Sequence, residues 1–218
     1  IYTSSDESVL TVDNMGIAKG LKVGKSQITI ASEEAPSIKV NLDVTVDPFS
    51  GDYPREGWTM AASHPLFKSK DDAEKNSLAS ALDGDLNTNF CLTRPGKTLG
   101  EEPNKVSVPA EDIIYFIVDM KESLDVNYFR MRYRNNKDAF LRFVKFDEIS
   151  GSNDGETFTS IAKNFTVTDA SVASKEESPD LKLPDCKYRY LKFAAGNKEC
   201  FASNGSSVQI KEFYVGRK

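Results

Sequence analysis

The stretch Ile38-Lys39-Val40-Asn41-Leu42-Asp43-Val44-Thr45-Val46 alternates apolar and polar residues without a break. A period of two predicts a β-strand with one buried and one solvated face. Two short apolar runs precede it, at residues 9–12 and 27–30, and turn-forming residues lie between them. Residues 1–46 are therefore predicted to form a few short strands, too few for a complete sandwich.

The rest of the chain has the same all-β character. Pro, Gly and Asp crowd together at 47–54 and break the strand pattern, as is typical of a linker. We therefore divide the chain into a partial domain at 1–47, a linker at 48–56 and a large domain at 57–218. Further strands are predicted at residues 113–118, 128–133, 142–149, 157–162, 188–193 and 208–215.

Two segments of the large domain differ from strands. The Ala, Glu and Lys content of residues 71–81 predicts one short helix, which Asp83-Gly84 would stop. Residues 96–111 have no periodicity and are rich in Pro, Gly and Glu. Such a segment is typical of a loop that is either functional or mobile.

The composition limits the classes of function. A chain of 218 residues with 39% hydrophobic residues and 13 Phe can bury a sizeable core. The net charge of −5 argues against nucleic acid as a partner, because phosphate binding needs a concentrated basic surface. No apolar run approaches the roughly 20 residues that span a bilayer, so no membrane span is expected in this chain.

The reactive residues do not point to an enzyme. A Ser-His-Asp triad would have to use His64, the only histidine, and no Gly-x-Ser-x-Gly motif presents a serine. Acidic residues are plentiful, but nothing singles out a pair of them for glycoside hydrolysis. The sequence therefore predicts a non-catalytic protein.

The three cysteines lack the spacing of a metal site. An odd number allows at most one disulfide and leaves at least one free thiol. Cys186 and Cys200 can pair if their segments meet in the fold, and the sequence leaves that geometry open.

Residues 2–28 resemble a known family. Tyr2-Thr3-Ser4-Ser5-Asp6 is followed by Val12-Asp13, Gly16, Gly24 and Ile28. This pattern resembles the second half of a bacterial group 2 immunoglobulin-like domain, whose first strands would precede Tyr2.

From Trp58 onward the chain resembles the discoidin, or coagulation factor V/VIII C-type, domain. The diagnostic stretch is Ala81-Leu82-Asp83-Gly84-Asp85-Leu86-Asn87-Thr88-Asn89-Phe90. Four further blocks follow in the order of the family, at residues 115–120, 150–158, 188–193 and 210–215. The resemblance implies an all-β protein in which a discoidin-type jelly-roll β-sandwich follows the partial immunoglobulin-like segment.

The pairing of these two families, with Gly57-Trp58-Thr59 at the start of the second, resembles surface lipoproteins of gut Bacteroidetes. In that group such domains are similar to family 32 carbohydrate-binding modules. The resemblance implies a glycan or polysaccharide as the partner. It also implies an extracellular or outer-membrane-surface location, with a lipid anchor in the full-length precursor. The alternative is an adhesion or structural domain that contacts a partner protein or further domains of the same chain.

A calcium site is predicted at the tight loop that carries Asp83, Asp85 and Thr88, whose oxygens can turn toward one point. Glu212 shares its strand face with apolar residues, where a carboxylate is costly unless it is paired or metal-bound. Glu212 is therefore expected to be a further ligand. Carbohydrate-binding discoidin modules carry a structural calcium at the matching positions, so the resemblance agrees. The alternative is an Asx turn, in which Asp83 bonds its own backbone.

The candidate ligand-binding residues lie in loops, because discoidin modules bind through loops at one end of the barrel. Arg134 ends a predicted strand, and its guanidinium can donate to sugar hydroxyls, although the arginines at 130–134 fit a solvated sheet face as well. Phe201 is a large aromatic residue in a polar loop, which is costly to expose without a use. Trp58 and Phe90 are assigned to the core. The full candidate set is His64, Phe67, Arg94, Arg134, Asn136, Phe201 and Asn204.

Overall fold

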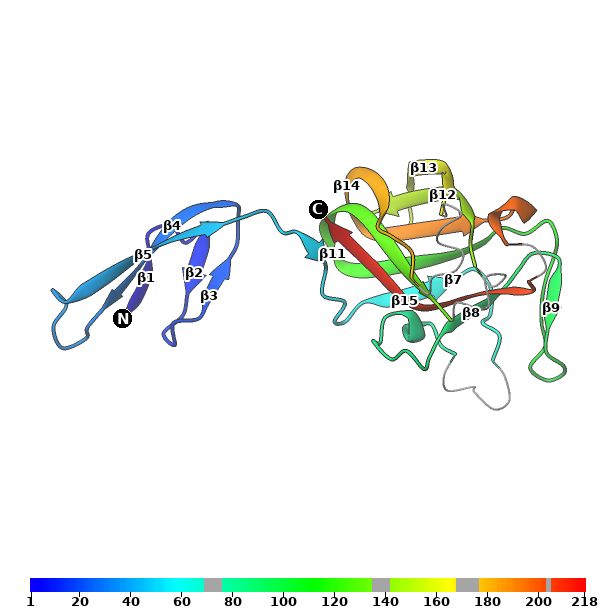
Figure 1. Cartoon of the computed structure of the whole chain (residues 1–218), viewed down its shortest axis with the longest axis horizontal. Coiled ribbons are helices and arrows are strands. Elements are labelled where there is room, and N and C mark those ends of the chain that lie inside the picture. Colours follow the sequence, from blue (N-terminus) through cyan, green and yellow to red (C-terminus); the bar gives the residue numbers. More distant parts are fainter. Residues whose placement is uncertain (69–75, 135–141, 168–176, 203–204) are drawn as a thin grey trace. The chain divides into compact units, whose positions relative to one another are not determined.

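The computed structural model describes residues 1–68, 76–134, 142–167, 177–202 and 205–218. The chain divides into two compact units, residues 1–50 and 51–218 (Figure 1). In the described ranges both units consist of β-strands, with two 3-10 turns in the second, η1 (Ala79–Ala81) and η4 (Lys198–Cys200). No helix in these ranges is long and apolar enough to cross a membrane.

The first unit is a small sandwich of two sheets. An antiparallel sheet has the order β1 (Tyr2–Ser4), β4 (Gly24–Ala31) and β5 (Lys39–Val46). A hairpin of β2 (Leu10–Val12) and β3 (Ala18–Gly20) accompanies it. The core is limited to Val9, Leu10 and Ile28, with Val12, Val44 and Val46 packed against them.

The alternating stretch that predicts a strand at 38–46 does form β5, but its apolar face is largely exposed. Ile38, Val40 and Leu42 are 69%, 64% and 53% exposed. Of the apolar residues of β5, Val44 and Val46 pack against the core cluster of this unit. The periodicity therefore predicted the strand correctly and its buried face incorrectly.

The second unit is built around one extended antiparallel sheet system. The strand order is β13-β12-β14-β11-β15-β6, with β7 paired to β11 and β8 paired to β15. The strands are β6 (Gly51–Asp52), β7 (Thr59–Ala62), β8 (Phe90–Thr93), β9 (Lys97–Leu99), β10 (Val106–Val108), β11 (Ile114–Tyr133), β12 (Lys145–Ser152), β13 (Thr159–Thr166), β14 (Leu181–Ala195) and β15 (Ser207–Arg217).

Strand β11 joins the layers of this unit. Its first half pairs with β14 and β7, and its second half pairs with β14 and β15. The register between β11 and β14 shifts between Asp119 and Leu124 and again between Val126 and Tyr128. Such irregularities bend a strand, which lets one strand pass from one layer to the next. The sequence predicts two strands, at 113–118 and 128–133, where the fold has this single bent one.

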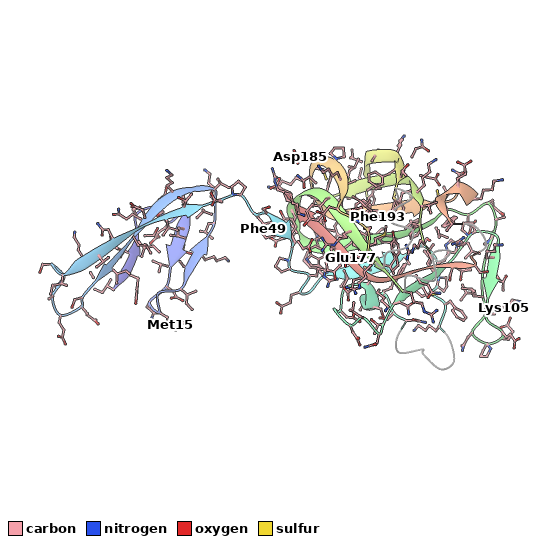
Figure 2. The ribbon with its side chains drawn as sticks, viewed as in Figure 1. Met15, Phe49, Lys105, Glu177, Asp185 and Phe193 are labelled. Atoms are coloured by element: carbon pink, nitrogen blue, oxygen red, sulfur yellow. The ribbon has the colours of Figure 1, made fainter. Side chains whose placement is uncertain are left out.

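The core of the second unit is a cluster of phenylalanines. Phe193, labelled in Figure 2, lies at its centre, with ring centroids 4.9 Å from Phe116, 4.9 Å from Phe129 and 5.0 Å from Phe213. Burying one such side chain stabilises a fold by about 1.5–3 kcal/mol. Trp58 and Phe90 belong to the same core, as expected.

Residues 51–55, expected in the linker, are bound to the second unit. Asp52 in β6 pairs with Gly216 in β15. The backbone N–H of Tyr53 donates to Val215 O at 2.9 Å, and its hydroxyl donates to Asp125 O at 2.7 Å. The segment before Trp58 is therefore part of the sheet system of the second unit.

The sequence predicted no strand in residues 71–81 and 96–111, and the structure differs between these two segments. Of the helix expected at 71–81, residues 71–75 lie outside the described residues, and the rest contains only η1. Residues 96–111 include a hairpin of β9 and β10, in which Thr98 and Ser107 are hydrogen-bonded through their hydroxyls at 2.9 Å. Its three-residue strands are too short to show a period of two in the sequence.

All three cysteines are free thiols. Cys186 lies within β14, opposite Val126, whereas Cys200 lies in η4 beyond the end of that strand. The disulfide that the sequence left open is therefore not formed. Burial raises the pKa of Cys91 and of Cys186 to about 11 and that of Cys200 to about 12.

Candidate functional site

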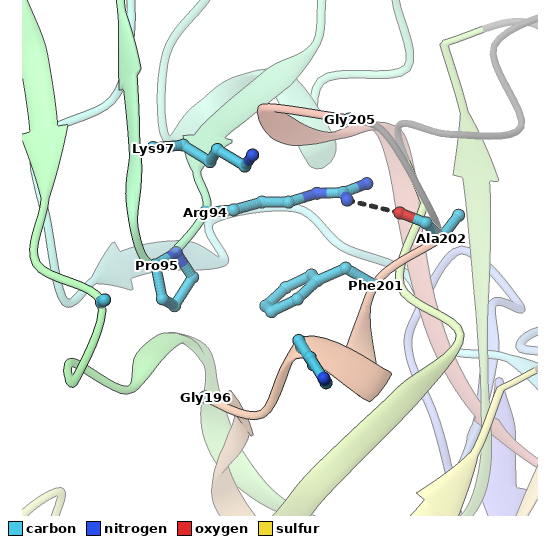
Figure 3. A pocket seen from close by; sticks show the side chains of 9 residues that line it. Arg94, Pro95, Lys97, Gly196, Phe201, Ala202 and Gly205 are labelled. Atoms are coloured by element: carbon cyan, nitrogen blue, oxygen red, sulfur yellow. Dashed lines mark hydrogen bonds between the residues drawn. The ribbon is translucent and has the colours of Figure 1, made fainter.

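A pocket of about 540 Å³ lies between the turn after β8 and the connection from β14 to β15 (Figure 3). Its lining combines three cationic side chains, one aromatic ring and small or apolar residues. The lining residues are Arg94, Pro95, Lys97, Ala110, Gly196, Lys198, Phe201, Ala202 and Gly205. None of these described lining residues is acidic.

The turn that carries Arg94 and Lys97 is fixed by the sheet. Thr93 at the end of β8 pairs with Ser207 in β15, and Arg94 N–H donates to Ser206 O at 3.0 Å. Gly96 follows with a φ of +70°, a left-handed conformation that glycine adopts without strain. Its N–H donates to Val108 O at 2.9 Å, which starts the β9–β10 hairpin.

Arg94 is the most deeply placed cation of the pocket, with only 4% of its surface exposed. Its Nε donates to Ser207 O at 3.1 Å and its Nη1 to Ala202 O at 2.5 Å, the bond drawn in Figure 3. Burial lowers the pKa of Arg94 to about 10, so the guanidinium remains charged at neutral pH. The side chain is therefore held in one orientation before any ligand binds.

Phe201 is a wall of the pocket. The ring is 8% exposed, lies 5.1 Å from the Arg94 guanidinium carbon and packs against Phe143 with a centroid distance of 5.9 Å. The expectation of an exposed aromatic residue in a polar loop is therefore wrong about burial. The loop returns to the core at this residue, where Phe143 and Phe201 form a β-bridge.

The loop that carries Lys198 and Phe201 is anchored by Asp147. Its carboxylate accepts hydrogen bonds from Gly196 N at 2.7 Å, from Asn197 N at 3.1 Å and from Asn197 Nδ2 at 2.6 Å. Burial acts to raise the pKa of Asp147, but these hydrogen bonds outweigh it and lower that pKa below the ordinary value. The carboxylate therefore stays ionised and fixes the start of the loop.

Of the seven predicted ligand residues, Arg94 and Phe201 line this pocket. His64 lies elsewhere, with its ring nitrogens 2.9 Å from Ser63 Oγ and 2.9 Å from Asp112 Oδ2. Phe67 packs beside the β9–β10 connection, where a Cβ on Gly100 would lie 2.6 Å from its ring. Arg134 donates to Gln209 Oε1 at 3.1 Å. Asn136 and Asn204 lie outside the described residues.

Sequence reasoning missed Lys97 and Lys198. Both lie within three residues of a predicted site residue, Arg94 or Phe201, and in the same connections. The sequence signal that could have identified them is a basic residue three positions away from each of two candidate residues.

The arginines of β11 were described as fitting a solvated sheet face. Arg130 is not simply solvated, because it contacts the carboxylates of Asp52 at 2.5 Å and Asp180 at 3.0 Å.

The loop of Asp83, Asp85 and Thr88 is closed by its own hydrogen bonds. Asp83 Oδ1 accepts from Asp85 N at 2.8 Å, and Thr88 Oγ1 donates to Asp83 Oδ2 at 2.9 Å. Asp85 Oδ1 in turn accepts from Asn87 N at 2.9 Å. This is the Asx-turn pattern that was the alternative to calcium.

Glu212 is fully buried, and its carboxylate is paired with Arg55. Arg55 Nη1 also donates to Phe213 O at 3.1 Å and to Ala81 O at 3.2 Å. Its guanidinium carbon lies 4.4 Å from the centre of the Tyr214 ring. The Arg55 Nη1 atom therefore contacts the carbonyl oxygen of Ala81 in η1 together with the Glu212 carboxylate and the Phe213 carbonyl of β15.

These contacts do not fit a resident Ca²⁺ ion that has Glu212 as a ligand. The positive charge that a buried carboxylate requires is already supplied by Arg55. Within the described residues, no group of three or more His, Cys, Asp or Glu side chains is arranged to hold a metal. The calcium site predicted from the sequence stays a prediction, and the effect of removing calcium on the unfolding midpoint tests it.

Comparison with known proteins gives a family and a fold. The family profile described as F5/8 type C domain matches residues 60–210. CpGH89CBM32-5 from Clostridium perfringens, solved in complex with GalNAc-β-1,3-galactose, is similar at 19% identity with a TM-score of 0.54, covering 76% of this chain and 99% of its own. No match was found among curated proteins.

Two further solved structures have the same fold. The C-terminal domain of a chitobiase from Bacteroides fragilis is 16% identical with a TM-score of 0.55, covering 76% of this chain and 96% of its own. CBM32-3 from a family 31 glycoside hydrolase of Clostridium perfringens is 17% identical with a TM-score of 0.52, covering 77% and 95%. The expected all-β discoidin-type fold of the second unit is confirmed.

Proposed function

Because the chain belongs to the F5/8 type C domain family, we propose that it is a non-catalytic carbohydrate-binding protein that holds a glycan in the pocket around Arg94 and Phe201. The observation that carries this proposal is the fixed guanidinium beside an aromatic wall. The similar module from Clostridium perfringens was solved with a bound disaccharide, which supports the same class of ligand.

The pocket supplies the two kinds of contact that a sugar ring needs. Guanidinium and ammonium groups donate hydrogen bonds to hydroxyl oxygens, and a partly apolar wall contacts the C–H face of the ring. Since Arg94 is held by Ala202 and Ser207, little side-chain entropy is lost when it binds a ligand. Micromolar to millimolar affinity, about 4–8 kcal/mol, is the range expected of such a pocket.

A glycan array probed with the full chain tests this function, with positives measured by calorimetry. Replacing Arg94 by Gln is expected to abolish binding, whereas Arg134→Gln makes the same change of charge outside the pocket and is expected to leave it unchanged. Circular dichroism of both variants separates a lost contact from a lost fold. Equal binding by wild type and a folded Arg94→Gln variant would contradict the proposed site.

A second function, contact with a partner protein or with further domains of the same chain, is favoured by the first unit. Val40 and Leu42 in β5, with Ile38 directly before this strand, form an exposed apolar row. Such rows often mark interaction surfaces. If the array shows no glycan binding and Val40→Lys removes an association seen by light scattering, this second function replaces the first.

An extracellular or outer-membrane-surface location, with a lipid anchor in the precursor, belongs to the same proposal. It rests on the resemblance of the sequence to surface lipoproteins. Protease treatment of intact cells that express the natural precursor tests it, because a surface protein is digested while a cytoplasmic marker is protected. Protection of both proteins would contradict the surface location.

A further inference from the structure

Three oxygen atoms, one from η1 and two from β15, contact the Nη1 atom of Arg55. They belong to the carboxylate of Glu212, to the carbonyl of Phe213 at 3.1 Å and to the carbonyl of Ala81 at 3.2 Å. Carboxylate and carbonyl oxygens are the ligands that Ca²⁺ takes in proteins. In this chain a guanidinium nitrogen therefore makes the contacts that a bound cation would make.

The charges of this oxygen group balance without a further ion. Glu212 supplies its carboxylate, and the other two oxygens are neutral carbonyls. One guanidinium neutralises the group, whereas a divalent ion in the same place would leave an excess positive charge beside a fully buried carboxylate. The carboxylates of Asp83 and Asp85 are bound within their own loop, where they accept hydrogen bonds from Asp85 N at 2.8 Å and Asn87 N at 2.9 Å.

The fold holds Arg55 at this position from both sides. Tyr53 N donates to Val215 O at 2.9 Å, and Trp58 N donates to Arg55 O at 3.1 Å. The guanidinium carbon of Arg55 also lies 4.4 Å from the centre of the Tyr214 ring. Because this cation is tethered to the oxygens it contacts, its presence does not depend on the concentration of an ion in solution.

We propose that Arg55 is the resident cation of this site in place of Ca²⁺, and that removing its side chain converts the site into a calcium site. Glu212 Oε1 is buried and has no hydrogen-bond partner in the part of the chain that the structure describes, so both carboxylate oxygens can bind a metal once Arg55 is truncated. A cavity of about 380 Å³, lined in part by Arg55, Trp58 and Asp83, lies beside the guanidinium and gives ions and water access. This role of Arg55 is independent of the glycan pocket around Arg94.

Terbium luminescence tests this site in the full chain, because Tb³⁺ binds to calcium sites and emits when a nearby tryptophan transfers energy to it. Trp58, the only tryptophan, lines the same cavity as Arg55. The wild-type protein is expected to give no sensitised emission that Ca²⁺ can compete away. Arg55→Ala is expected to give such emission, with a Ca²⁺ dissociation constant of about 0.1–1 mM, the weak end of the range for protein calcium sites. Its unfolding midpoint is expected to rise with added Ca²⁺.

Three variants connect the emission to this site. Glu212→Gln in the Arg55→Ala background removes the carboxylate and is expected to abolish both the emission and the effect of Ca²⁺ on the midpoint. Arg55→Lys keeps a positive charge at the same position and is expected to bind neither ion, as in the wild type. Arg134→Ala is the matched control, because Arg134 is exposed and bonds Gln209 instead, and it is expected to behave as the wild type.

Three results would overturn the proposal. The first is Ca²⁺-competed emission from the wild type together with a midpoint that EDTA lowers, since Arg55 is then not the resident cation. The second is a folded Arg55→Ala variant that binds neither ion. The third is emission that survives Glu212→Gln, which places the metal elsewhere. If Arg55→Ala is unfolded in EDTA, the recovery of its circular dichroism on adding Ca²⁺ becomes the readout, and a lack of recovery counts against the latent calcium site.

Discussion

Replacing Arg55 by Met removes the charge that neutralises the buried carboxylate of Glu212 and keeps a side chain of similar length. The Glu212 side chain is 0% exposed and that of Arg55 is 15% exposed, so the pair lies largely out of water. Breaking a buried pair by removing one partner costs about 3–5 kcal/mol. The hydrogen bonds to Ala81 O and Phe213 O are lost as well.

A loss of this size is measurable as a change in the unfolding midpoint. For a unit of this size, about 1 kcal/mol lowers the midpoint by roughly 2–4 °C, so a decrease of roughly 6–20 °C is expected for Arg55→Met. Trp58, the only tryptophan, lies in the core of the second unit, so its fluorescence reports on this unit. A matched control is Arg134→Met, which removes an exposed arginine bound to Gln209.

The second variant of the series is Arg55→Met combined with Glu212→Gln. Removing both charges is expected to recover much of the stability, because an uncharged buried pair needs no compensating ion. Calcium provides the decisive comparison. Because Arg55 already supplies a cation, EDTA is expected to leave the wild-type midpoint unchanged.

Two results would refute this reasoning. A change of less than about 1 kcal/mol on Arg55→Met, the size typical of an exposed pair, would mean that the pair is not a buried one. A fall in the wild-type midpoint on adding EDTA, restored by Ca²⁺, would support the sequence-based prediction of a structural calcium and displace Arg55 from this role.

Three further predictions concern other parts of the second unit. Burial acts to raise the pKa of Asp119, but hydrogen bonds from Arg189 and Lys121 lower it overall. The ionised Asp119 carboxylate therefore stabilises the fold above the unfolded-state pKa of about 4. This stabilisation is lost as the pH falls toward the lower folded-state pKa of Asp119. Asp119→Asn should accordingly cost about 1–3 kcal/mol in urea unfolding at pH 7, and progressively less below pH 4. Gly216→Ala should lower the free energy of unfolding by about 1–3 kcal/mol, because a Cβ there would lie 2.3 Å from Gly51 O and 2.3 Å from the Tyr128 hydroxyl; equal midpoints would contradict the close approach. Because Cys91 and Cys200 are buried with raised pKa values, a thiol reagent at pH 8 should modify them only after denaturation, and rapid labelling of both in the native protein would contradict that burial.

Several strands of the second unit were predictable because apolar runs coincide with the blocks of the family. Residues 208–215 lie within β15, and residues 188–193 lie within β14. The β9–β10 hairpin was not predictable, since each strand has only three residues and is held by the Thr98–Ser107 contact. The hydrogen bonds of Tyr53 to Val215 and Asp125 were equally hidden, because the sequence around it resembles a linker.

The candidate site was predictable in part. Arg94 and Phe201 were selected as loop residues, and both line one pocket although they are far apart in the chain. Lys97 and Lys198 were missed because single lysines in polar loops carry no periodic signal. Glu212 was selected because a carboxylate on an apolar face needs to be paired or metal-bound, and it was assigned to calcium, whereas the structure pairs it with Arg55. The sequence could not supply that partner, since Arg55 lies 157 positions away and is brought near by the pairing of β6 with β15 and by the hydrogen bonds of Tyr53.

The pairing of β6 with β15 also determines how the second unit responds to a pulling force. Gly51 and Asp52 begin the unit, Gly216 and Arg217 lie near its end, and the two pairs are adjacent and antiparallel. Tension applied at residues 51 and 218 therefore pulls two neighbouring strands apart from their shared end, so their hydrogen bonds break one after another rather than all at once. We expect a strand pair loaded in this way to open from Gly51 and Asp52 toward Tyr53, before the contact of Arg55 with Glu212 is reached. Mechanical load and the stability of the η1 loop are thereby coupled through a segment of a few residues.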